Sequence, residues 1–236
     1  MEISSLITMY KREKSSSERQ NFENLYESAA EFCNPSADNI QSKRSKGQRD
    51  DEQRITDIGI KARRMFTAGM MSHLFPQGQN WIRVVPQNRD LQKSDNVVRA
   101  LSSVTKKFVR AIEESNFYEE MGQCIDHCGY IGTTSLYCEP TAKCILNFRS
   151  HYINQFFFCE NYLGEVDTVI REFKLTARQA VQQFGEDCPE NIAELAQDPK
   201  SSTKEFTFIH IVMPRSKFVP DSPEKTEKPI ASYYIS

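Results

Sequence analysis

The apolar residues of this chain change their spacing near Thr133, and this change limits the folds open to it. Before that point they recur every three or four positions, the spacing of one face of an α-helix. After it, short β-branched and aromatic segments alternate with a period of two, as strands do. Helices first and strands afterwards predict an α+β fold, mainly antiparallel, rather than alternating α/β units. The expected strands are TSLYCE, CILNFR, QFFFCE, EVDTVIREF and EFTFIHIVM.

Four apolar-striped stretches predict helices in the first part of the chain. The first is interrupted at Ser15–Ser17, where a serine can cap a second helix, and Pro35 ends it because proline cannot continue a helix. In the second stretch Ala68 and Gly69 leave room for a close helix neighbour. Such stripes are typical of side chains that pack in a hydrophobic core rather than of a catalytic or binding site. The expected helices cover residues 2–33, 54–74, about five turns from Ser94 or Asp95, and 117 to about 129.

The segment FPQGQNW at residues 75–81 gathers a proline, a glycine and the only tryptophan of the chain. Pro76 cannot extend the preceding helix, and Gly78 supplies a turn conformation that is costly for other residues. The tryptophan then opens the extended segment WIRVVP. The pattern predicts a sharp turn from a buried helix into a strand, anchored by a buried Trp81.

The second part of the chain carries its own turn signals. NYLG, between two expected strands, predicts a hairpin loop. In LTARQAVQQFG, Thr176 and Gln179 stand at the two positions of a capping box, and Gly185 closes the short helix. The final IASYYIS is compatible with the start of a further strand and equally with a frayed terminus.

Bulk composition excludes several classes of protein. With 236 residues, 39% hydrophobic and 26% charged, the chain is typical of a globular protein. Its net charge of −2 argues against a dedicated non-specific DNA binder, which would be clearly basic. Seven cysteines without a signal peptide predict reduced, intracellular thiols. No apolar run is long enough for a membrane span, so we expect a soluble protein with no membrane partner.

The sequence offers little for catalysis or for a bound cofactor. No P-loop, GxGxxG, GxSxG, HExxH or EF-hand spacing is present. Cys124, His127 and Cys128 lie on one predicted helix and would suit zinc or redox chemistry, but a zinc site normally has two separated ligand pairs. Cysteines on a helix are more commonly buried, reduced side chains than metal ligands or redox groups. We therefore predict no enzyme, no cofactor, and no catalytic, cofactor-binding or metal residue.

A nucleic-acid-binding module is a further alternative. The basic run KRSKGQR lies within the long polar connector at residues 36–53, and a second basic group stands at Lys106, Lys107 and Arg110. Lysine and arginine neutralise phosphates, so either group could contact a nucleic acid. Composition alone favours a solvated loop for the connector.

Four motifs, in order, resemble one protein family. DIGIKARRMFTAGMMSHLFPQGQNWIRV resembles the hallmark of the head-to-tail connector (portal) family of short-tailed phages and prophages, in which a helix with an AG segment meets a Pro/Gly turn and a tryptophan. The other three similar passages are IEESNFYEEMGQCIDHCGYIGTTSLYCE, GEVDTVIREFKLTARQAVQQFG and FIHIVMPR. Together they cover about residues 54–215.

This resemblance implies a structural rather than a chemical role. Family members form a ring of about twelve copies at one capsid vertex of the virion. Double-stranded DNA passes through the ring during packaging and ejection. The implied partners are a terminase motor, capsid, scaffold and tail adaptor proteins, with assembly in the host cytoplasm. Members are roughly twice this length, so we expect an N-terminal helical segment and connector at 1–53 and a wing-like body at 54–236, truncated before the stem and clip.

Overall fold

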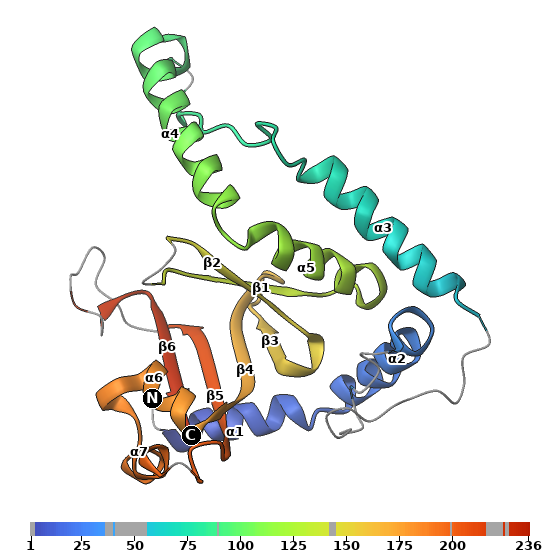
Figure 1. Ribbon diagram of the computed structural model, residues 1–236, viewed down its shortest axis with the longest axis vertical. Helices are drawn as coiled ribbons and strands as arrows, with labels where there is room; N and C mark the ends of the chain where they lie inside the picture. Colours follow the sequence, from blue (N-terminus) through green and yellow to red (C-terminus); the bar gives the residue numbers. More distant parts are fainter. Residues whose placement is uncertain are drawn as a thin grey trace. The chain divides into compact units, whose positions relative to one another are not determined.

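The chain has the predicted α+β architecture, with helices first and antiparallel strands afterwards. The computed structural model describes residues 3–35, 40, 56–88, 90–141, 145–198, 200–215, 224 and 227–236. They form two compact units, coloured along the sequence in Figure 1. We call residues 1–20 with 155–236 the sheet unit, and residues 21–154 the helical unit.

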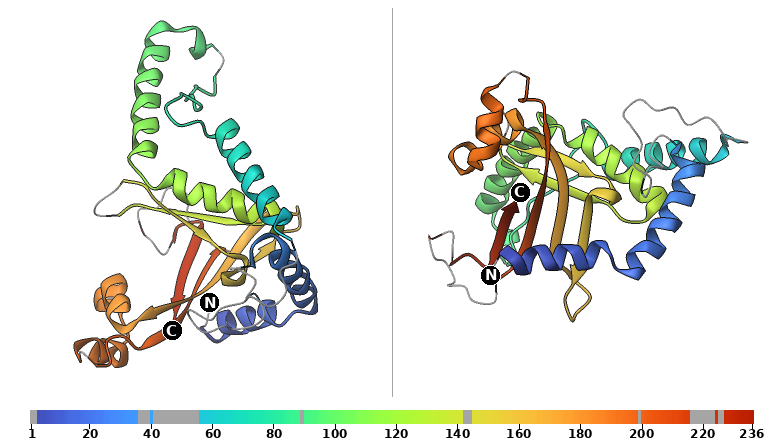
Figure 2. Two further views of the ribbon diagram at one scale, coloured as in Figure 1. Left: turned by 45° about the vertical axis from the view of Figure 1, so that its right-hand side comes forward. Right: turned by 90° about the horizontal axis from the view of Figure 1, so that it is seen from below.

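The sheet unit is built on four antiparallel strands in chain order. They are β3 (Phe156–Glu160), β4 (Val166–Thr176), β5 (Glu205–Pro214) and β6 (Ile230–Ile235). Helix α1 (Ile3–Lys14) lies across the sheet (Figure 2). Leu6 and Tyr10 of α1 pack on Phe157, Ile170 and Ile211, which lie opposite one another on three neighbouring strands and point to the same face. In the final segment IASYYIS, residues 230–235 pair with β5, so this segment is a strand and not a frayed end.

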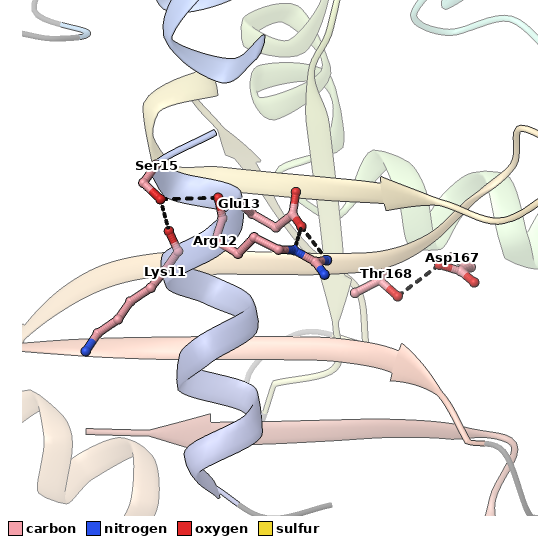
Figure 3. A network of polar contacts seen from close by, with 6 residues as sticks. All are labelled: Lys11, Arg12, Glu13, Ser15, Asp167 and Thr168. Atoms are coloured by element: carbon pink, nitrogen blue, oxygen red, sulfur yellow. Dashed lines mark hydrogen bonds and ion pairs between the residues drawn. The ribbon is translucent and has the colours of Figure 1, made fainter. Parts of the chain in front are cut away.

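Polar contacts fix α1 at its C-terminal end. The Tyr10 hydroxyl donates to Glu172 Oε2 of β4 over 2.6 Å, and Lys14 Nζ pairs with the same carboxylate. Burial, followed by this hydrogen bond to Glu172, raises the pKa of Tyr10. Ser15 Oγ donates to the Lys11 carbonyl over 2.8 Å and closes the last turn of the helix (Figure 3). Helix and sheet are thus joined by both apolar and polar contacts.

The structure confirms both local predictions for the second part of the chain, the hairpin loop and the capping box. NYLG is the hairpin loop between β3 and β4, and Gly164 adopts a φ of 77° there. Thr176 Oγ1 accepts from the Gln179 amide while Gln179 Oε1 accepts from the Thr176 amide, the full capping box of α6 (Ala177–Phe184). A further helix that the sequence did not predict, α7 (Glu190–Gln197), follows. The two helices cover Phe208 of β5 and form a second core cluster.

The helical unit places one helix against a two-stranded sheet. It contains most of α2 (Ser17–Cys33), then α3 (Ile58–Leu74), α4 (Asp95–Glu113), α5 (Phe117–Ile131), β1 (Ser135–Glu139) and β2 (Asn147–His151). The Asn116 side chain just before α5 accepts from the Phe148 amide and donates to the Phe148 carbonyl, each over 2.8 Å. Glu120 accepts from the Ser150 amide over 2.6 Å. These bonds hold α5 on β2, and α4 extends away from it (Figure 1).

Two predictions about the first part of the chain were wrong. The segment at residues 81–86 is extended but forms no strand, because no partner strand lies beside it among the described residues. Helix α3 is not buried, since every one of its residues is partly or largely exposed to solvent. The connector at 36–53 lies outside the described residues, apart from Ile40, and the proposed boundary at 53/54 stays a prediction.

Candidate assembly surface

The predicted turn after α3 carries an aromatic cluster. Helix α3 ends at Leu74, and Gly78 has a φ of 75°, as a left-handed turn position requires. The Trp81 ring lies 4.9 Å from the Phe75 ring and stacks on Phe117 at 5.8 Å between centroids. Its indole Nε1 donates to the Tyr118 hydroxyl over 3.3 Å. Trp81 is half-buried, whereas Phe117 is 6% exposed and stands at the centre of the cluster.

The segment after Trp81 bonds to a helix instead of a strand. The Val84 amide donates to Thr105 Oγ1 of α4 over 3.1 Å, and the same hydroxyl donates to the Leu101 carbonyl over 2.8 Å. A groove of about 400 Å³ runs between this segment and α4, lined by Ile82 and Val98 among others. The backbone of this segment therefore bonds to a side chain of α4 and not to a neighbouring strand.

One side of α3 is fixed on α5. Asp126 of α5 lies 3.2 Å from Arg63 Nε and accepts from Thr67 Oγ1 over 3.1 Å. The Phe66 ring packs directly over Gly129, where an added Cβ would lie 2.8 Å from Phe66 Cδ1. A larger residue at position 129 would have to displace the Phe66 ring, so α3 approaches α5 closely along this side.

The other side of α3 faces solvent. Ile58 and Met65 are 70% and 76% exposed, although the sequence pattern places them on the apolar stripe. Gly69 would accept a Cβ with no described atom within 4 Å, so the close helix neighbour expected there is absent from the part of the chain that the structure describes. At Gly59 the backbone does approach a neighbour, since an added Cβ would lie 2.6 Å from the Phe32 carbonyl oxygen of α2.

Helix α2 also turns apolar side chains outward. Phe22, Leu25 and Phe32 are 54%, 62% and 63% exposed. With Ala29 they repeat at intervals of three, four and three residues, the spacing of side chains that pack against another helix. We call Phe22, Leu25, Ala29 and Phe32 the α2 seam.

Helix α4 carries a similar row. Val97, Leu101, Val104 and Phe108 repeat at intervals of four, three and four residues, and we call them the α4 seam. Val104 and Phe108 are 48% and 43% exposed, while Val97 and Leu101 are half-buried. Figure 1 shows α4 standing away from α5 and the β1–β2 pair. The helical unit therefore buries residues such as Phe117 and Ile131 but leaves apolar rows exposed on α2, α3 and α4.

The structure separates the residues considered for zinc or redox chemistry. Cys124 is buried, and its sulfur accepts from Thr134 Oγ1 over 3.3 Å. Cys128 is exposed, with its thiol directed to the Gly132 carbonyl of its own helix end. The His127 ring packs edge-on against Tyr152, and burial lowers its pKa. Within the described ranges no three His, Cys, Asp or Glu side chains are placed to hold a metal ion.

Only one of the two basic groups considered for nucleic-acid contact lies among the described residues. KRSKGQR lies outside the described residues. Lys106 and Lys107 are exposed on α4, and Arg110 pairs with Glu114 over 2.6 Å. Sequence reasoning recognised these basic residues but missed the outward seams, because an apolar stripe shows that a partner is needed and not where that partner comes from. Among the described helices, none has the length and apolarity to cross a membrane.

Comparison with known proteins identifies the family. The chain is 25% identical over 173 residues to the probable portal protein of Bordetella phage BPP-1, a match covering 73% of this chain and 31% of that protein. It is 27% identical over 173 residues to the portal protein of Salmonella phage epsilon15, covering 72% of this chain and 31% of that protein. The match thus spans about a third of the length of these curated relatives. A model of the family described as bacteriophage head to tail connecting protein matches residues 7–236, and the chain therefore belongs to this family.

Proposed function

We propose that this chain is the wing-containing part of a portal subunit, a structural component of the ring at one vertex of a phage capsid. Copies of the chain contact one another around the ring, and viral DNA passes through its centre during packaging and ejection. The family match over residues 7–236 is the observation that carries this proposal. The portal proteins of the two similar phages support it further.

The surface of the helical unit suits a ring subunit. Leu25, Met65 and Val104, on three different helices, expose between 48% and 76% of their surface in a single copy. A monomeric protein rarely leaves such rows uncovered, whereas a subunit of a ring buries them against its neighbours. The role needs no catalytic group, and we assign none.

The charge of the chain suits a passage for DNA. A net charge of −2 gives little general attraction to phosphates, so DNA would slide rather than adhere. We place the protein at the head–tail vertex of the virion, in contact with the capsid and tail adaptor. During assembly it would also meet scaffold proteins and the terminase motor that drives DNA inward.

Electron microscopy of the purified protein tests this proposal. Negatively stained particles should be rings with an axial hole, and class averages should give the number of copies. An epitope inserted in the exposed NYLG turn, where Tyr162 is 94% exposed, should label a single vertex of each virion. Particles that remain monomeric, in protein carrying every segment present in its longer relatives, would contradict the proposed role.

A further inference from the structure

We propose that neighbouring copies join when the hairpin loop of one copy enters the α4 groove of the next. The hairpin loop is residues 160–167, which include the turn between β3 and β4. The α4 groove is the cleft of about 400 Å³ between residues 80–86 and α4. This inference rests on the proposed function and names the surfaces by which the ring would assemble. Each copy offers one loop and one groove, so the contact is heterologous and its repetition closes a ring when the rotation between copies permits.

The tip of the hairpin loop carries two apolar side chains that its own copy does not cover. Tyr162 and Leu163 are 94% and 64% exposed. In the right-hand view of Figure 2 this loop projects beyond the sheet. The tip therefore occupies no groove of its own copy. A large aromatic side chain buried in a pocket of the partner is a frequent anchor of protein interfaces.

Hydrogen bonds hold the hairpin loop in one conformation although its tip faces solvent. Asn161 Oδ1 accepts from the Leu163 and Glu165 amides over 2.9 and 3.0 Å. The Asn161 amide donates to the Glu165 carbonyl over 2.8 Å, and the Gly164 amide donates to the Asn161 carbonyl over 3.0 Å. A loop that is already ordered loses little conformational entropy when a partner binds it, so the tip is suited to binding.

The α4 groove can receive such a tip. Its walls include Ile82 from the extended segment, and Val98 and Leu101 from α4. A volume of about 400 Å³ lies within the range of roughly 300–1,000 Å³ in which protein clefts enclose small ligands. A tyrosine and a leucine side chain can therefore enter the groove together and cover its apolar walls.

The charges of the two surfaces are opposite. From Glu160 to Asp167 the hairpin loop has three acidic residues and no basic one. Arg83 and Lys106 line the groove, and none of its described lining residues is acidic. Both cations are exposed, and no described carboxylate forms an ion pair with either of them. Opposite charges favour a loop in a groove, while like charges disfavour contact between two loops or two grooves.

A second acidic surface of the chain fits the groove less well. Glu190, Glu194 and Asp198 are exposed along one side of α7, since residues four positions apart share a helix face. None of the large apolar residues of α7 is exposed. This surface would match the cations of the groove but leave its apolar walls uncovered. The hairpin loop offers both the charges and the apolar tip.

Removal of the apolar tip is the first test. A variant with Tyr162→Ser and Leu163→Ser keeps Asn161 and Gly164, so the turn is retained. Sedimentation velocity of the full-length protein should show self-association roughly a hundredfold weaker than that of the unmodified protein, because the aromatic anchor of the contact is lost. Ile145→Ser removes a side chain that is 79% exposed outside the loop and the groove, so this control should associate as the unmodified protein does.

A charge exchange tests which two surfaces meet. One variant carries Glu160→Lys and Glu165→Lys in the loop, and the other carries Arg83→Glu and Lys106→Glu in the groove. Each variant alone brings like charges together and should self-associate roughly tenfold more weakly. Their equimolar mixture should associate like the unmodified protein, because the reversed loop then meets the reversed groove and the unmodified loop meets the unmodified groove. The two kinds of copy should alternate.

Two controls separate the contact from folding and from net charge. Lys107→Glu with Lys200→Glu changes the net charge as much as the groove variant does, but outside the groove, and should leave self-association unchanged. All the substituted residues are exposed, so circular dichroism and thermal melts of every variant should match those of the unmodified protein. The epitope in the NYLG turn also removes the tip from its own copy, so vertex labelling should use rings in which most copies are unmodified and hold the labelled copy through its groove.

Several results would overturn this contact. One is unchanged self-association of the tip variant, and another is a mixture of the charge variants that associates no better than either variant alone. A groove variant that loses salt-dependent binding to a DNA duplex, with self-association unchanged, would assign Arg83 and Lys106 to phosphate instead. Rings formed by the tip variant would leave the portal role intact, whereas absence of rings in the unmodified full-length protein counts against the role itself.

Discussion

The two units of this chain treat their apolar residues in opposite ways. In the sheet unit, Ile170 and Ile211 are fully buried and Leu6 is 1% exposed. Its large exposed apolar residues lie in the hairpin loop or near the ends of helices and strands, and they are Ile3, Tyr162, Leu163, Val166, Ile230 and Tyr234. In the helical unit, Leu25 and Met65 are 62% and 76% exposed in the middle of helices. The sheet unit completes its core within one copy. The helical unit leaves rows of apolar side chains exposed on its described helices.

A phenylalanine-to-alanine substitution should therefore change stability much more in the sheet unit than in the helical unit. Phe208→Ala in the sheet unit removes a ring that is 2% exposed and packed by Phe173 and Phe184, so the free energy of unfolding should fall by about 3–5 kcal/mol. Phe32→Ala removes a ring that is 63% exposed, so the free energy of unfolding of the monomer should change by less than about 0.5 kcal/mol. Urea unfolding of dilute protein measures both values.

The effects of these two substitutions on self-association should be reversed. Phe32→Ala should weaken self-association, since Phe32 belongs to the α2 seam, while whatever Phe208→Ala protein remains folded should associate normally. Equal losses of unfolding free energy in the two variants would mean that α2 is buried within a single copy, and the contrast between the units would disappear.

The aromatic cluster after α3 lies between these extremes. Trp81→Ala should lower the free energy of unfolding by about 2–4 kcal/mol, because the indole packs on Phe75 and on the buried Phe117 although it is itself half-buried. Tyr118→Phe removes only the hydrogen bond to the indole and should change stability by about 1 kcal/mol or less. Thermal melts of both variants give the comparison. A melting temperature unmoved by Trp81→Ala would instead place Trp81 at a contact between copies.

Local signals in the sequence predicted local structure well. Thr176 and Gln179 form the expected capping box, Gly164 closes the expected hairpin loop, and Gly78 takes the expected turn conformation. Each of these depends on residues fewer than five positions apart. The change of apolar period near Thr133 predicted the fold class for the same reason, because periodicity is a property of the short segment itself.

Contacts between distant segments were predicted less well. The run WIRVVP has the composition of a strand, yet the Val84 amide bonds to Thr105 and no strand lies beside it in the described part of the chain. The stripe on α3 indicated burial, but Met65 faces solvent because α5 occupies the opposite side through Arg63 and Thr67. A stripe fixes which face needs a partner. It does not say whether that partner belongs to the same copy.

Acid should weaken the sheet unit through a single histidine. His210 is 6% exposed, its ring stacks on Tyr234 at 4.1 Å, and burial followed by the charge of Arg171 lowers the pKa of His210 to about 4. The folded ring stays neutral below pH 6.5 while the unfolded one binds a proton, so stability is complete above pH 6.5 and falls as the pH approaches 4. Between pH 7.5 and 4.5 we expect a loss of about 2 kcal/mol from this group.

Urea unfolding across this pH range tests the expectation. His210→Gln does not titrate and can still hydrogen-bond the Ser232 hydroxyl, which lies 2.8 Å from His210 Nε2. Its stability curve should be flatter between pH 6.5 and 5, above the range where most carboxylates titrate. Parallel curves for the variant and the unmodified chain would show that His210 is not the group responsible.

The smallest expected effects come from glycine-to-alanine substitutions on two faces of α3. Gly69→Ala should raise the free energy of unfolding of the monomer by about 0.5–1 kcal/mol, because alanine favours a helix and the new Cβ meets no described atom within 4 Å. Gly59→Ala should lower it by about 1–2 kcal/mol, because its Cβ would lie 2.6 Å from the Phe32 carbonyl oxygen and the backbone must move. Thermal unfolding of dilute protein should therefore shift in opposite directions for the two variants. Destabilisation by Gly69→Ala would reveal a neighbour on the open face of α3 even in a single copy, and the helical unit would then have a covered core like that of the sheet unit.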